Sequence, residues 1–174
     1  IQQGMAAVDR VCDIIETPAD IRDPEKPLPI AATPHGLRFE NVCFRYDTRM
    51  VLREIDLSVD AGEIVALVGV SGGGKTSLVN LIPRFYDVDS GAVLIDGTDV
   101  RQASIRQLRD QIAIVTQEPI LFNDTVRANV AYGNPVAASE QITAAAEAAY
   151  AADFIRQLPD GYDTVIGEAG GRLS

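Results

Sequence analysis

The 174-residue sequence predicts an α/β fold with an antiparallel sheet, a core of buried parallel strands and a helical C-terminal part. Apolar and polar residues alternate over 37–44 and 55–59, which is typical of half-buried antiparallel strands. The run 64–68 (IVALV) is continuously apolar and rich in β-branched residues, as in a strand buried on both faces of a parallel sheet. Residues after 124 are rich in alanine, a strong helix former.

The order of these patterns divides the chain. Residues 1–17 carry apolar side chains every three or four positions and predict a helix. Five prolines mark 18–36 as a linker. We assign 37–123 to the core and antiparallel sheet, and 124–174 to a helical subdomain. The chain does not begin with methionine, so we expect it to belong to a longer protein.

Further elements follow along the core. Residues 60–62 (DAG) predict a turn, and 75–85 has helical spacing. The strand predicted over 92–95 ends at Asp96-Gly97, a hairpin-type pair. A short helix is expected over 104–111 with Ser104 as its N-cap, before a second buried strand over 112–115. In the helical part, Asp124 is the expected cap of one helix and Ser139 begins the next.

Composition excludes several function classes. The net charge is -10, which argues against nucleic acid as a partner because nucleic-acid binding needs a basic face. The single histidine, His35, makes a His-rich zinc site or a Ser-His-Asp triad untenable. Cys12 and Cys43 form no CxxC pair and are interpreted as reduced thiols.

Residues 69–76 read GVSGGGKT and fit the pattern G-x-x-x-x-G-K-[ST], between a predicted strand and a predicted helix. Glycines let the backbone approach a phosphate closely, so that successive N–H groups and the helix start can point at the anion. The Lys75 ammonium would meet the β- and γ-phosphates, and the Thr76 hydroxyl suits Mg²⁺. The pattern predicts a P-loop fold that binds a nucleoside triphosphate through Gly69, Val70, Ser71, Gly72, Gly73, Gly74, Lys75, Thr76 and Ser77.

A phosphate-transfer site also needs an acidic metal partner, usually an Asp after four apolar residues. Residues 92–96 (AVLID) have this form. Gly97 follows Asp96 at once, and Ser90-Gly91 precedes the run, so we interpret Asp96 as a turn residue of a hairpin. This interpretation leaves the metal-binding Asp and the catalytic base without a candidate in the sequence.

Essentially the whole sequence resembles the nucleotide-binding domains of ATP-binding cassette (ABC) exporters of the multidrug and lipid A type. The likeness lies in the P-loop with Ser71, in Phe44-Arg45-Tyr46, in IVTQEP around Gln117, and in the stretches RFYDVDSG, LFNDTVRANVAYG and DTVIGEAG. The resemblance implies an ABC-type P-loop NTPase fold with antiparallel β, parallel-sheet and α-helical parts. It also implies that Tyr46 stacks on adenine and that Gln117 has a catalytic role, reaching Mg²⁺ and the attacking water.

The same resemblance implies partners and a location. Two such domains would sandwich two ATP molecules and drive the transmembrane domain of the same transporter, at the cytoplasmic face of the inner membrane. Residues 1–17 resemble the helix that leaves the last membrane span. The stretch 163–170 resembles the loop that contacts the membrane domain, with Glu168 as its key residue; Val165 stands where the family often has an acidic residue. A lipid or lipophilic substrate is expected from overall likeness.

The sequence also departs from the family pattern. It ends in Leu173-Ser174, where the family continues into Gly-Gly-Gln, and it lacks the later acidic pair and switch histidine. We therefore expect an incomplete core and negligible hydrolysis by this chain alone. Two alternatives stay open: a soluble P-loop kinase and a non-catalytic nucleotide-binding fragment. A kinase would need a basic lid, but 124–170 carries only Arg127 and Arg156.

Overall fold

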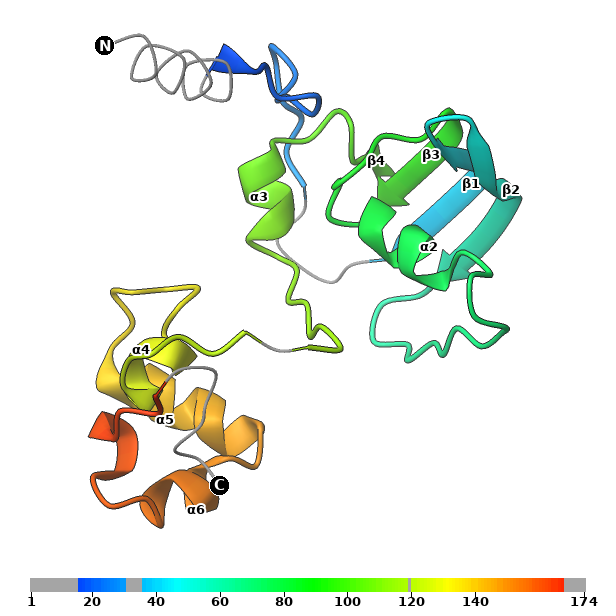
Figure 1. Cartoon of the computed structure of the whole chain (residues 1–174). Helices are drawn as coiled ribbons and strands as arrows, with labels where there is room; N and C mark the ends of the chain where they lie inside the picture. Colours follow the sequence, from blue (N-terminus) through cyan, green and yellow to red (C-terminus); the bar gives the residue numbers. More distant parts are fainter. Residues whose placement is uncertain (1–15, 31–35, 119, 168–174) are drawn as a thin grey trace, which may run out of the picture. The chain divides into compact units, whose positions relative to one another are not determined.

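The computed structural model describes residues 16–30, 36–118 and 120–167. The chain forms two compact units, 1–113 and 114–174 (Figure 1). The predicted helix over 1–17 falls almost wholly outside the described residues, as do His35, Glu168 and the C-terminal Leu173-Ser174. Within the part that is described, no helix combines the length and apolar character needed to cross a bilayer.

The first unit is built on a four-stranded antiparallel sheet in the order β2-β1-β3-β4 (Figure 1). Its strands are β1 (Leu37–Tyr46), β2 (Arg49–Val59), β3 (Ser90–Ile95) and β4 (Thr98–Asp99). The alternating patterns over 37–44 and 55–59 therefore predicted β1 and part of β2 correctly. The central strand β1 sends Phe39, Val42 and Phe44 into the core. A register shift between Phe39 and Val42 explains why their spacing departs from strict alternation.

Two helices complete the core of this unit. Helix α2 (Lys75–Leu81) contributes Leu78 and Leu81, and helix α3 (Ile105–Arg109) contributes Leu108, to the apolar cluster on the sheet. Helix α2 is shorter than predicted because Pro83 has no N–H to continue it and Arg84 takes a left-handed φ of 52°. Ser104 is the N-cap of α3, but the carboxylate of Asp23 accepts the first helical N–H, from Ile105, at 2.6 Å.

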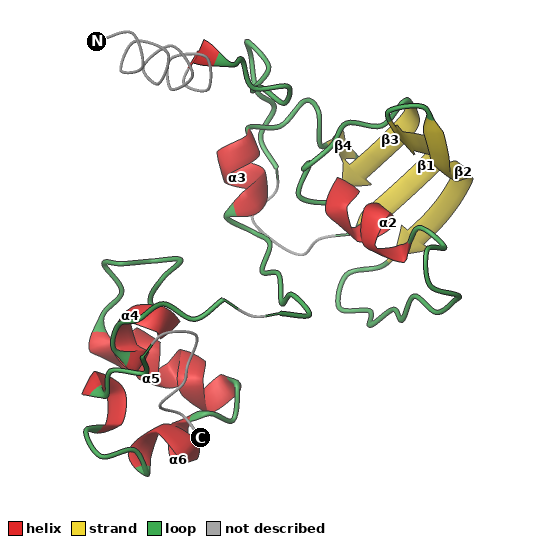
Figure 2. Ribbon diagram, viewed as in Figure 1, coloured by secondary structure: helices red, strands yellow, loops and turns green. Residues whose placement is uncertain are grey.

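The two predicted buried strands are not formed, and both predictions are wrong for this structure. Residues 64–68 and 112–115 have no regular secondary structure (Figure 2). Ile64 is 96% exposed and Val68 88% exposed, the opposite of a strand buried on both faces. A parallel strand exists only when neighbouring strands bond to its edges. The described residues offer these segments no such neighbour, since their strands all belong to the antiparallel sheet.

The second unit is helical. It contains α4 (Val126–Val130), α5 (Ser139–Ala148), α6 (Ala152–Arg156) and a 3₁₀ turn, Gly161–Asp163. Its core contains one or two buried aliphatic residues from each helix and one from the segment after the turn: Val126, Ala146, Ala152, Ile155 and Ile166. The cap of α4 is Thr125, whose hydroxyl accepts the Ala128 N–H at 3.1 Å, so the prediction of Asp124 was off by one residue.

Candidate functional site

The glycine-rich loop joins the apolar run 64–68 to the start of α2. Gly72 and Gly74 have φ values of 77° and 86°, in the left-handed region that favours glycine. At Gly74 a Cβ atom would also lie 2.8 Å from Leu52 Cδ2 of strand β2. The sequence GVSGGGKT therefore meets two demands at position 74: a positive φ and a close approach of the loop to the sheet.

Unpaired donors gather where the loop enters the helix. The Gly73 N–H donates to the Val70 carbonyl oxygen at 3.2 Å, which closes the loop. The N–H groups of Lys75, Thr76 and Ser77 donate no hydrogen bond to any residue of the described chain. The first N–H groups of a helix lack partners within it and carry its partial positive charge. This arrangement leaves adjacent donors available to an anion.

Lys75 adds a full positive charge to these donors. Its ammonium donates to the carbonyl oxygens of Gly69 and Val70 at 2.9 and 2.7 Å, so it lies over the loop. It forms no ion pair with a carboxylate of the described residues. Each of its two bonds goes to a neutral oxygen, which a phosphate oxygen can replace with a charge-assisted bond.

Thr76 supplies an oxygen next to this charge. Its side chain is exposed, and its hydroxyl makes no hydrogen bond with described residues. The described chain contains no group of three or more His, Cys, Asp or Glu residues able to hold a metal ion. A hydroxyl oxygen is a ligand type that Mg²⁺ accepts, and phosphate oxygens are another.

Tyr46 lies at the end of β1 in a corner of three aromatic rings. Its ring forms T-shaped contacts with the rings of Phe44 and Tyr86, with centroid distances of 4.8 and 5.1 Å and interplanar angles of 82° and 87°. Tyr46 keeps 36% of its surface exposed. No role was predicted for Tyr86 from the sequence, although an aromatic residue in the RFYD turn after a helix is a visible signal.

The remaining residues singled out from the sequence, Gln117, Asp96 and Val165, lie in different parts of the chain. Gln117 belongs to the second unit, where it is exposed in a segment without helix or strand. Asp96 is a turn residue, as interpreted: its φ is 49°, it joins β3 to β4, and its carboxylate accepts the Gly36 N–H at 2.7 Å. Val165 pairs with Thr125 in an isolated antiparallel bridge and is partly exposed.

Comparison with known proteins identifies a family. The profile of the ABC transporter family matches residues 52–174. An ATP-dependent lipid A-core flippase of Syntrophus aciditrophicus is 55% identical, and a putative multidrug export ATP-binding/permease protein of Bacillus subtilis is 47% identical. The matches cover all of this chain but only 29% and 30% of those proteins.

A solved structure is similar over the same length. A bacterial Atm1-family ABC exporter with ATP bound is 41% identical with a TM-score of 0.89, over 100% of this chain and 31% of that one. The P-loop fold predicted from GVSGGGKT is confirmed by these matches at the level of the domain. With its family profile matched over more than half of its residues, the chain belongs to the ABC transporter family.

Proposed function

We propose that this chain is the ATP-binding part of the nucleotide-binding domain of an ABC exporter. In this role it couples ATP binding and hydrolysis to export of a lipid or lipophilic substrate. It would act at the cytoplasmic face of the inner membrane, with a transmembrane domain of the same protein and a second nucleotide-binding domain. Relatives that carry the names lipid A-core flippase and multidrug exporter support the transport role.

The observation that carries the proposal is the Lys75 ammonium beside unpaired backbone donors. A triphosphate entering the loop would accept from the N–H groups of Lys75, Thr76 and Ser77. Lys75 would exchange the Gly69 and Val70 carbonyl oxygens for phosphate oxygens. The exchange moves one side chain and leaves the loop's own Gly73–Val70 hydrogen bond in place.

The remaining roles follow from chemistry and family likeness. Thr76 and Gln117 would hold Mg²⁺, which neutralises charge on the phosphates when it is bound. Gln117 would also orient the attacking water. By family likeness, Tyr46 would stack on adenine with the part of its ring that stays exposed, 36% of the residue's surface being accessible.

The test measures binding and turnover separately on the intact protein. Lys75→Ala is compared with Lys26→Ala, which removes the other lysine of the sequence, an exposed one in the Pro-rich segment. We expect Lys75→Ala to lower Mg·ATP affinity about a hundredfold or more, since it removes a charge-assisted contact and the charge itself. Lys26→Ala should bind as wild type.

Two results would contradict the proposal. Unchanged Mg·ATP affinity in Lys75→Ala would remove the loop from the binding site. Tight Mg·ATP binding by the full-length wild-type transporter without any phosphate release would instead favour the non-catalytic alternative. Equilibrium titration gives the first quantity and phosphate release the second.

A further inference from the structure

Tyr86 lies in the turn 83–89, which follows α2, and its ring contacts both other rings of the aromatic corner. It approaches Tyr46 at 5.1 Å in a T-shaped arrangement and Phe44 at 5.5 Å. The Tyr46 ring is therefore nearly perpendicular to two neighbouring rings, those of Phe44 and Tyr86. Edge-to-face contacts of this kind fix the orientation of a ring as well as burying it.

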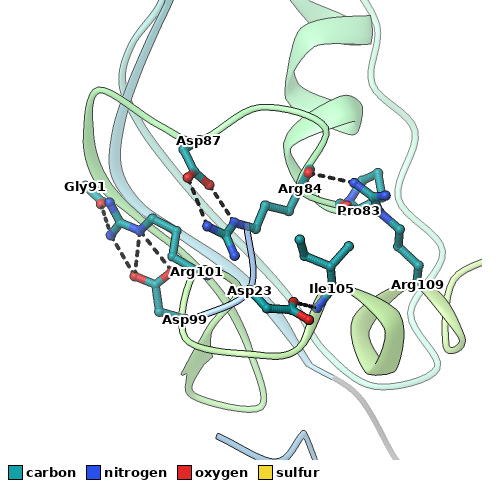
Figure 3. Close-up of polar contacts among 9 residues, drawn as sticks. All are labelled: Asp23, Pro83, Arg84, Asp87, Gly91, Asp99, Arg101, Ile105 and Arg109. Carbon is teal, nitrogen blue, oxygen red and sulfur yellow. Dashed lines mark hydrogen bonds and ion pairs between the residues drawn. The ribbon is translucent and has the colours of Figure 1, made fainter. Parts of the chain in front are cut away.

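A buried arginine forms an ion pair within the turn 83–89. Arg84 is 5% exposed and forms a two-pronged pair with Asp87, at 2.7 Å from Nε and 3.0 Å from Nη2 (Figure 3). These two residues flank Phe85 and Tyr86, so the pair closes the turn around the two aromatic side chains. Paired, charge-assisted bonds are directional and keep such a turn in one geometry.

A second set of bonds fastens the turn to the end of β1. The Asp89 carboxylate accepts the Arg45 backbone N–H at 2.8 Å and also pairs with the Arg45 guanidinium at 2.9 Å. The Asp89 N–H donates to the Cys43 carbonyl oxygen at 3.0 Å. Arg45 directly precedes Tyr46, so the segment that carries Tyr86 is bonded to the backbone next to Tyr46.

The neighbouring aromatic residue, Phe85, contacts helix α3 instead of Tyr46. The guanidinium carbon of Arg109 in α3 lies over the Phe85 ring, 5.1 Å from the ring centroid. Arg109 also donates to the carbonyl oxygens of Pro83 and Arg84 at 3.0 Å each (Figure 3). Phe85 and Tyr86 are equally exposed, at 43% and 42%. The turn therefore presents two similar aromatic side chains, of which Tyr86 contacts Tyr46 and Phe85 contacts Arg109.

We propose that Tyr86 is a positioning residue for the nucleobase: its perpendicular ring contact holds the Tyr46 ring in the orientation that stacks on the base. The inference rests on the proposed function of Tyr46 and extends it to a residue outside the known motifs. Without Tyr86 the partly exposed Tyr46 side chain would gain rotational freedom, which binding would then have to remove. Affinity for nucleotides should fall, whereas affinity for a ligand without a base should not.

The test uses the intact protein, with ATP and inorganic tripolyphosphate as probes. Tyr86→Leu removes the ring, and Phe85→Leu is the matched control in the same turn. We expect Tyr86→Leu to weaken ATP binding about three- to tenfold and Phe85→Leu less than about twofold. Both should bind tripolyphosphate as wild type does, and Tyr86→Phe should restore ATP binding. Unchanged ATP affinity in Tyr86→Leu would overturn the inference.

A double variant separates positioning from direct contact with the base. If Tyr86 acts through Tyr46, Tyr46→Ala/Tyr86→Leu should bind ATP no more weakly than Tyr46→Ala alone. Additive losses would mean that Tyr86 touches the base itself, which would overturn the positioning role. If Tyr86→Leu fails to fold, Tyr86→Met replaces it, because methionine keeps a long apolar side chain without a ring.

The outcomes also distinguish this inference from the proposed function. No change in ATP affinity on Tyr46→Ala would remove the base-stacking role of Tyr46, and this inference with it. Weaker binding on Tyr46→Ala together with wild-type binding on Tyr86→Leu would contradict the role of Tyr86 alone.

Discussion

The glycine-rich loop 69–76 and the aromatic corner of Phe44, Tyr46 and Tyr86 belong to the same unit but are prepared for a ligand in different ways. In the loop, the Lys75 ammonium bonds to the loop's own carbonyl oxygens, and three helical N–H groups have no partner among the described residues. In the corner, Tyr46 already has both of its ring contacts. When a phosphate enters, Lys75 in the loop must exchange its hydrogen bonds to carbonyl oxygens for bonds to the phosphate. The rings of the aromatic corner already contact one another before a base binds.

This difference indicates where affinity comes from. Charged contacts to a triphosphate are strong and need one side chain to move, so substitutions in the loop should have large effects. A stacked base contributes about 1–3 kcal/mol, so substitutions in the corner should have small ones. Variants in the two regions should consequently separate phosphate binding from base binding.

Gly74→Ala should have the largest combined effect, because it disturbs both the fold and the loop. The change places a Cβ at a φ of 86° and 2.8 Å from Leu52 Cδ2, so either the buried Leu52 side chain or the loop must shift. We expect a loss of about 2–3 kcal/mol in the free energy of unfolding and a drop of at least about tenfold in ATP affinity. Denaturant unfolding and ATP titration measure the two effects.

Gly72→Ala is the matched control, because Gly72 has a similar φ of 77° but no atom lies within 4 Å of the position that its Cβ would take. It should cost about 1 kcal/mol, from backbone strain alone. Equal losses in the two variants would show that contact with the sheet does not shape the loop.

Thr76→Val should have an intermediate effect that depends on the metal. Valine keeps the shape of the side chain and removes the exposed hydroxyl. We expect about tenfold weaker binding of Mg·ATP and unchanged binding of ATP in the presence of a chelator. Thr76→Ser should restore Mg·ATP binding; failure of serine to do so would argue against a metal-binding hydroxyl.

Tyr46→Ala should give the smallest of these losses. We expect ATP and GTP to bind several-fold more weakly and to the same extent, because stacking on a ring does not read the edge of the base. Tyr46→Phe, which keeps the ring, should bind both nucleotides as wild type does. A loss confined to ATP would point to recognition of the base by hydrogen bonds.

The hairpins of the antiparallel sheet could be predicted from sequence because their strands pair with neighbours along the chain, although β1 also pairs with the distant β3. Strands β3 and β4 are joined by the Asp96-Gly97 turn, and β1 pairs with β2 across a short connection. The runs 64–68 and 112–115 have equally clear apolar patterns, yet they are not strands. Their apolar pattern indicates a preference for burial. Whether they form strands depends on a neighbouring strand that can bond to their edges, and the segment's own residues do not reveal this.

Competition between neighbouring residues of similar chemistry limited the prediction of helix ends. Asp124 and Thr125 are both good capping residues, and only the backbone decides which of them caps α4. The phosphate-binding loop could be predicted from the local sequence GVSGGGKT alone, because phosphate binding by backbone groups needs glycines in that spacing. Tyr86 was missed since its role depends on bonds from Asp89 and Arg84 that bring its turn to Tyr46.

The most direct test of the phosphate site is competition between ATP and inorganic tripolyphosphate on the intact protein. Tripolyphosphate should displace ATP from the wild type, should bind Tyr46→Ala equally well, and should lose its affinity in Lys75→Ala. If tripolyphosphate does not compete with ATP, or binds Lys75→Ala as tightly as the wild type, the loop 69–76 is not the phosphate site and the central claim is wrong.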